Sequence, residues 1–222
     1  MIDPKIKYSI AAALQSFSDY SDFDATKLTR KFNEIFALDD DFMTKVDKLD
    51  EIFDNNPQLE ILREVFFDLL MINFFSADVK KLEEDYLETP EWEEIEEQTL
   101  DRGTELLNVL LYLNECEDEH LEPELEDYLK EFLLVDEDEF QDEYRIYEPV
   151  IANQILMESP VEEISKIADS LPDDSELKEL FYPVMCFFQN IDPSVPEKAK
   201  IADKALDKPF DMAVLNILQA FK

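Results

Sequence analysis

The pattern of apolar and polar positions along the chain is helical almost throughout, and it is most apolar over residues 59–77. Thirteen of these nineteen residues are hydrophobic, and no acid follows Asp68 until Asp78. A helix this apolar has no broad face suited to water, so we expect a helix over 57–76 to form the buried centre of the protein. Its charges leave too short an uncharged run to cross a bilayer, and we expect no contact with a membrane.

Apolar side chains recur every three or four residues on both sides of this segment, as on one face of an α-helix. Asp-Pro at 3–4, Asn-Pro at 56–57 and Thr-Pro at 89–90 have the cap-then-proline order that opens helices. The chain contains one glycine, Gly103, whereas tight β-hairpins depend on this residue. We therefore predict the all-α fold class, as a multi-helical array of antiparallel helix hairpins.

The same pattern predicts one long helix from residue 90 to about residue 115, with Gly103 inside it. Glycine within a helix costs roughly 1 kcal/mol against alanine. We expect Gly103 either to allow close contact with another helix or to mark a bend.

The last third of the chain is similar to itself at a spacing of 34 residues. SKIAD at 165–169 recurs as AKIAD at 199–203, and YEPVI at 147–151 aligns with FYPVM at 181–185. A helix pair of 34 residues is the period of tetratricopeptide repeats, which the C-terminal third resembles over about 125–222. Chance similarity between two amphipathic helices is the alternative explanation.

These patterns suggest two parts within one continuous globular unit. The first, residues 1–120, is an N-terminal helical part that contains the buried helix at 57–76. The second, residues 121–222, is a part built from repeat-like helical hairpins.

Composition supports a folded protein and a reducing environment. Hydrophobic residues make up 45% of the 222 residues and include seventeen phenylalanines, whereas disordered acidic chains are poor in aromatic residues. Two cysteines, Cys116 and Cys186, are too few for a disulfide framework at this length. The first residues lack the long apolar region of a signal peptide, so we expect a cytoplasmic location.

The charge is strongly negative and unevenly spread. The net charge is −36, and residues 83–143 carry 26 acids against Arg102 and Lys130, which places −24 in this middle region. Such a field repels nucleic acid and anionic membranes and attracts basic partners or cations. We therefore expect a basic protein or peptide as partner and no nucleic acid, with solubility alone as the alternative. Binding to a copy of itself, as a homo-oligomer, stays open.

Few residues are suited to catalysis or metal binding. One glycine cannot form a glycine-rich phosphate loop, and the single histidine, His120, limits any nucleophile–base pair. We therefore assign no catalytic residue, expect no cofactor and favour a protein that is not an enzyme. Cys116, Glu117 and His120 have a spacing that could place metal ligands on one helix. We expect no metal there, because His120 lies in a polar segment and no second histidine exists to complete a di-iron site.

Four residues of the acidic region are candidates for partner binding. Trp92, Tyr112 and Tyr128 could act as apolar anchors with a charged rim, or could be core residues at helical spacing. Arg102 is the only cation between Lys81 and Lys130. It could recognise an anionic group, but a structural ion pair is the interpretation that we favour.

Three function classes follow from these observations. The leading hypothesis is a non-catalytic protein–protein interaction module with an acidic surface. The first alternative is an acidic inhibitor or immunity-type protein that neutralises a basic partner or mimics nucleic acid. The second alternative is a small-molecule or metal-binding protein that uses carboxylates.

Overall fold

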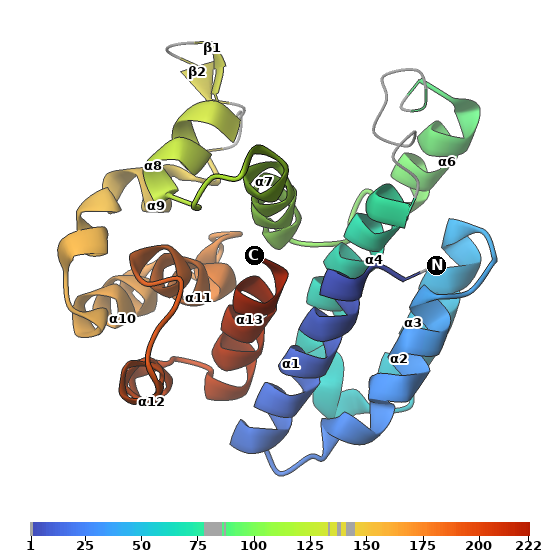
Figure 1. Ribbon diagram of the computed structural model, residues 1–222, viewed down its shortest axis with the longest axis horizontal. Helices are drawn as coiled ribbons and strands as arrows, with labels where there is room; N and C mark the ends of the chain where they lie inside the picture. Colours follow the sequence, from blue (N-terminus) through green and yellow to red (C-terminus); the bar gives the residue numbers. More distant parts are fainter. Residues whose placement is uncertain (1, 78–85, 87, 133, 137–138, 141–144) are drawn as a thin grey trace.

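Helices dominate the computed structural model, which describes residues 2–77, 86, 88–132, 134–136, 139–140 and 145–222 (Figure 1). The helices of the first half are α1 (Pro4–Tyr20), α2 (Thr29–Phe36), α3 (Phe42–Asp54), α4 (Arg63–Ala77), α6 (Pro90–Thr99) and α7 (Leu106–Glu119), with 3-10 turns η1 (Ala25–Leu28) and η2 (Pro57–Leu62). Those of the second half are α8 (Leu125–Asp127), the π-helical turn η4 (Tyr128–Phe132), α9 (Glu148–Ala152), the 3-10 turn η5 (Gln154–Glu158), α10 (Val161–Ser170), α11 (Lys178–Gln189), α12 (Val195–Lys204) and α13 (Lys208–Phe221).

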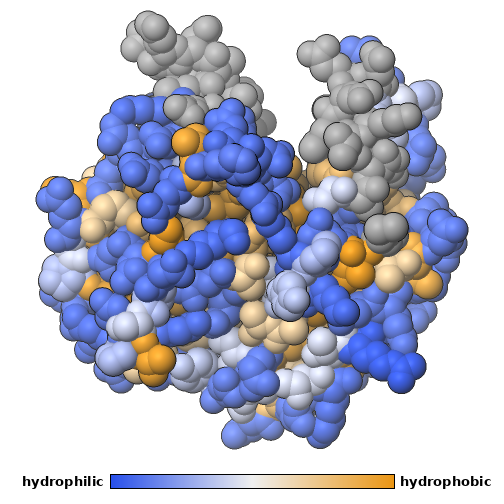
Figure 2. All heavy atoms as spheres, in the orientation of Figure 1, coloured by the Kyte–Doolittle hydropathy of each residue, from blue (hydrophilic) through white to orange (hydrophobic). Residues whose placement is uncertain are grey.

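The predicted all-α fold class is confirmed. Within the described residues, strand structure is limited to β1 (Leu134–Asp136) and β2 (Glu139–Phe140), which pair antiparallel as one short ribbon. The face shown in Figure 2 is mainly hydrophilic, with apolar side chains in small separate groups. No helix of the described part of the chain combines the length and apolarity needed to cross a bilayer.

Helix α4 is buried on all sides, as its composition predicts. Its most buried apolar residues are Val65, Phe66, Phe67, Leu69, Leu70 and Ile72. The helix packs against α1, α3 and α7. The helix predicted over 57–76 begins later than expected, at Arg63. Leu59 and Leu62 are both buried and three residues apart, which is the repeat of the 3-10 turn that precedes it.

Helix α13 connects the two ends of the chain, a role that the sequence did not suggest. It packs along α1 and also against α11 and α12, so the last helix lies beside the first (Figure 1). Ser16 Oγ accepts a hydrogen bond of 3.1 Å from Asn216 Nδ2, and Ser9 Oγ donates to Ile217 O at 3.4 Å. Thus α4 is the centre of the N-terminal helices, and α13 joins them to the C-terminal ones. The division at residue 120 stays a prediction.

The 34-residue similarity is reflected in one helix of each pair. Helices α10 and α12 begin 34 residues apart, at Val161 and Val195, whereas α11 and α13 begin 30 residues apart, at Lys178 and Lys208. A period that shifts within the pair does not confirm a tetratricopeptide array, so the repeat remains a prediction.

The long helix predicted from residue 90 to about 115 is interrupted around Gly103. Helix α6 ends at Thr99, α7 begins at Leu106, and Gly103 has a φ of +84°. A Cβ atom there would lie 2.7 Å from Asp68 Oδ1 and 3.3 Å from Phe67 Cδ1. Gly103 therefore does both things considered for it: it breaks the helix and allows close contact with another, α4.

The replacement Gly103→Ala is expected to lower the free energy of unfolding by about 2 kcal/mol or more. Positive φ costs an L-residue roughly 1–2 kcal/mol, and the new methyl group must also displace the buried Asp68 carboxyl. His120 has a φ of 60° at the end of α7, so its replacement by glycine tests the same backbone effect in the opposite direction. His120→Gly should stabilise by about 0.5–1 kcal/mol. Urea unfolding of both variants checks the pair, and a Gly103→Ala protein as stable as the wild type would contradict this explanation.

Candidate functional site

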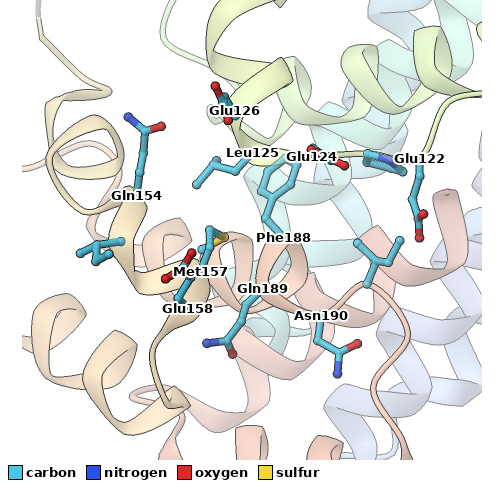
Figure 3. Close-up of a pocket in the computed structure, with 13 residues that line it drawn as sticks. Glu122, Glu124, Leu125, Glu126, Gln154, Met157, Glu158, Phe188, Gln189 and Asn190 are labelled. Carbon is cyan, nitrogen blue, oxygen red and sulfur yellow. The ribbon is translucent and has the colours of Figure 1, made fainter.

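A groove with a volume of about 700 Å³ lies between the start of α8, the turn η5 and the end of α11 (Figure 3). Its walls come from residues 122–126, 154–158 and 188–191. Exposed carboxylates line the rim: Glu122, Glu124, Glu126 and Glu158. Apolar side chains line the rest: Leu125, Ile155, Met157, Phe188 and Ile191. No lysine or arginine occurs among the described residues that line it.

The floor of the groove is anchored in the core. Leu125 is buried, and the ring of Phe188 is stacked on that of Tyr128, with 5.6 Å between centroids and 23° between planes. At the end of α11, Gln189 Nε2 donates to the carbonyl oxygen of Ser159 and, at 3.2 Å, to that of Leu156. These hydrogen bonds tie η5 to α11, so the two walls keep their spacing without any contribution from a bound partner.

Tyr112 fixes the third wall of the groove, which is the segment at the start of α8. Its hydroxyl donates to Glu124 O at 3.0 Å and accepts from Glu124 N at 3.0 Å, which attaches the segment before α8 to helix α7. Burial raises the pKa of the Tyr112 phenol, so it stays neutral and keeps both hydrogen bonds over the physiological pH range. Tyr112 therefore positions the acidic rim.

Tyr128 lies deeper, beneath the groove. Its hydroxyl donates to Tyr147 Oη at 3.3 Å, and Tyr147 in turn donates to the carboxylate of Glu105. Tyr112 and Tyr128 are only 5% and 1% exposed, so they have the core positions that were the alternative for them. Their burial argues against the direct partner contacts predicted for them, and it gives them a supporting role in the same site.

The rim carboxylates are mostly uncompensated. Glu126 forms an exposed ion pair with Lys130, and the pKa of Glu126 is lowered by the hydrogen bond to that lysine. Among the described residues, Glu122, Glu124 and Glu158 have no lysine or arginine within ion-pair distance. Three carboxylates around an apolar floor produce a local negative potential that favours a cation carrying apolar groups.

Trp92 and Arg102 lie away from this groove. Helix α6, which carries Trp92, stands on the opposite side of the molecule from α8 in Figure 1. Trp92 is half-buried against the rings of Phe75 and Tyr86, at centroid distances of 5.4 and 6.2 Å. The structure therefore does not bring together the four residues predicted as one partner-binding set, although Trp92 keeps some exposed surface.

Arg102 is bound within the protein, in the ion pair that we favoured for it. Its Nη1 and Nη2 atoms donate to the two oxygens of Asp50 at 3.0 and 3.1 Å, and its Nε donates to Glu64 Oε2 at 3.0 Å. The guanidinium also lies 4.8 Å from the centroid of the Phe67 ring. Since its three nitrogen atoms are all engaged, the structure leaves little of Arg102 to recognise an anionic ligand.

The three weak metal candidates all line one hollow at the end of α7, but their side chains have different surroundings. Cys116 is buried in α7, Glu117 pairs with Lys5, and His120 is exposed beyond the last turn of the helix. The described residues contain no group of three or more histidine, cysteine or acidic side chains that could hold a metal ion. Burial raises the pKa of the Cys116 thiol, which disfavours the thiolate that a metal would need.

Sequence reasoning missed the groove residues themselves. One signal was present: acids alternate with other residues in EPELE at 122–126, so three carboxylates lie close together in the chain where α8 begins. Nothing local could have placed Phe188 beside them, because it lies about sixty residues later in α11.

No protein-family model, curated protein or solved structure matches this chain.

Proposed function

We propose that this protein is a non-catalytic interaction module that binds a cationic, amphipathic segment of a partner protein in the groove between η5, α8 and α11. The observation that carries the proposal is the combination of an apolar floor with an acidic rim, with no lysine or arginine among the described lining residues. Apolar anchors supply binding energy at such a site, while the charged rim accelerates association and selects the sign of the partner.

Two features of the groove support a protein segment as its ligand. Leu125 and Phe188 are fixed in the core below it, and Tyr112 and Gln189 hold its walls, so little conformational entropy is lost on binding. An acidic inhibitor of a basic enzyme or toxin would use the same surface and is a special case of this proposal. A cytoplasmic location is part of it, because Cys116 and Cys186 are both free and buried.

Neutralising the rim by Glu122→Gln, Glu124→Gln and Glu126→Gln together is expected to weaken binding of a cationic amphipathic peptide by about 10-fold or more. Each charge pair at such a rim contributes roughly 0.5–1 kcal/mol, and the three add to more than one decade of affinity. The probe is a fluorescein-labelled peptide of lysine and leucine with leucines at helical spacing, and the measurement is fluorescence anisotropy at moderate salt.

The matched control removes three exposed acids from α6, as Glu93→Gln, Glu96→Gln and Glu97→Gln. It changes the net charge by the same amount, and binding should fall by no more than about 3-fold, because screened charges more than about 10 Å away contribute little. Equal losses of affinity in the two triple variants would show that the peptide responds to the overall negative charge of the protein and not to the rim of the groove. A peptide of the same composition in scrambled order must bind more weakly, since otherwise the apolar floor takes no part.

A further inference from the structure

A second hollow, with a volume of about 360 Å³, adjoins the groove. It lies between the end of α7, the segment before α8 and the residues that follow α11. Glu122, Pro123 and Ile191 line both hollows, so the two share one boundary and form a continuous surface. Leu121, which lines the second hollow, is among the exposed large apolar side chains of the described residues.

The second hollow already contains an ammonium group that belongs to the protein. Lys222 lines it, and Lys222 Nζ lies 2.6 Å from Asp192 Oδ2. The side chain of Lys222 is 21% exposed, and that of Asp192 is 83% exposed. Among the described lining residues of both hollows, Lys222 is the one lysine or arginine. The local chemistry thus accommodates a lysine beside Asp192.

We propose that one continuous cationic segment of a partner occupies both hollows and displaces Lys222 from Asp192. This inference rests on the proposed function and adds the path of the bound segment and the identity of an internal competitor. The apolar side chains of the segment contact Ile155, Met157 and Ile191, which keep exposed surface in the first hollow, above the buried Leu125 and Phe188. Its next lysine or arginine crosses the boundary at Pro123 and takes the position of Lys222.

Displacement of Lys222 is energetically easy. Ion pairs in which one partner faces water contribute little to stability, because solvent replaces the lost partner. Lys222 nevertheless repels an incoming cation, since both ammonium groups compete for the same carboxylate. Removal of the Lys222 charge should therefore strengthen binding of a segment that is long enough to reach Asp192, and leave a shorter segment unaffected.

The test compares two lysine–leucine peptides of about two and about four helical turns against single-site variants of the full chain. We expect the long peptide to bind the wild type about 10-fold tighter than the short one. Lys222→Gln should tighten binding of the long peptide by about 3-fold, and Asp192→Asn should weaken it by about 3-fold. Neither variant should change binding of the short peptide.

The chain offers a matched control pair at the other end of α11. Lys178 pairs with Asp173, and their side chains are 28% and 98% exposed, much as in the Lys222–Asp192 pair. Lys178→Gln and Asp173→Asn alter the net charge identically and should change binding of neither peptide.

Two results would overturn the inference: equal affinity for the long and short peptides, or Lys222→Gln behaving like Lys178→Gln. In either case the proposed function stands if the triple change at Glu122, Glu124 and Glu126 still weakens the short peptide. If that triple variant binds as the wild type does, the proposed function itself fails.

Discussion

Replacing Asp211 by asparagine is expected to stabilise the protein by about 2 to 4 kcal/mol near pH 8, and by about 2 kcal/mol less near pH 5.5. Asp211 lies in the first turn of α13 and is only 3% exposed. Its Oδ2 atom accepts hydrogen bonds from the backbone N–H groups of Leu206 at 2.8 Å and Asp207 at 3.1 Å. The side-chain oxygen of asparagine can accept both of these hydrogen bonds without a charge.

The direction of the pH dependence follows from the raised pKa. Burial, together with the nearby charges of Asp207 and Glu179, raises the pKa of Asp211 from 3.8 to about 7, despite the two backbone hydrogen bonds. Well below pH 3.8 the carboxyl is protonated in both the folded and the unfolded chain. Between pH 4 and 7 the unfolded chain loses this proton first, so the stability contributed by Asp211 falls as pH rises, and above pH 7 the penalty is complete.

Urea unfolding of the wild type and Asp211→Asn at the two pH values measures the difference directly. Contributions from other buried carboxyls, such as Asp68, cancel in this comparison. Asp203→Asn is the control, because Asp203 is an exposed residue of α12 and its replacement should change the free energy of unfolding by less than about 0.5 kcal/mol at either pH. An advantage of Asp211→Asn that is the same at both pH values would show that burial of this carboxylate costs the folded state nothing.

Replacing Arg102 by methionine is expected to lower the free energy of unfolding by about 2 to 3 kcal/mol. The change leaves the partly buried carboxylates of Asp50 and Glu64 with one partner fewer each, and removes the contact of the guanidinium with the Phe67 ring. The effect stays below that of a fully buried pair because Asp50 also binds Arg63, at 2.9 Å. Arg102→Lys keeps the charge but cannot donate to both carboxylates in this fork geometry, so we expect an intermediate loss.

Arg30 provides the matched control for Arg102. It pairs with Glu34 four residues along α2, and its side chain is 88% exposed. Arg30→Met should leave the free energy of unfolding almost unchanged, since exposed helical ion pairs contribute little. Arg102→Met should also bind the cationic peptide as the wild type does. If it is as stable as the wild type but loses peptide binding, Arg102 belongs to a recognition site and its structural assignment is wrong.

Much of the architecture could be predicted from local patterns. The all-round apolarity of residues 59–77 indicated the buried helix α4, and the single glycine indicated both an absence of large sheets and a special position at Gly103. The isolation of Arg102 in an acidic region indicated an ion pair. Each of these predictions depends on the composition of one segment or on the spacing of residues within it. Composition and spacing do not change when the chain folds.

The groove could not be predicted in the same way. Its three walls are separated by about thirty residues each along the chain, and its aromatic floor is held by the stacking of Phe188 on Tyr128. The sequence around Tyr112 and Tyr128 is the same whether these residues face solvent or the core. Helical spacing shows which residues share a face, but not whether that face packs against the protein or against a partner. The structure resolves this in favour of burial: Tyr112 is hydrogen-bonded to Glu124 of the rim, and Tyr128 stacks on Phe188 beneath the floor.

The sequence by itself determined the helical class, the burial of α4 and the sign of the surface potential. Only the tertiary structure decided which carboxylates are paired: Asp50 meets Arg102 from 52 residues away, whereas Glu122 and Glu124, at the rim of a groove, have no cation partner in the part of the chain that the structure describes. The physical reason is that periodicity and net charge can be read from the order and number of residues along the chain. An ion pair or a groove depends on the packing of segments that are far apart in the chain.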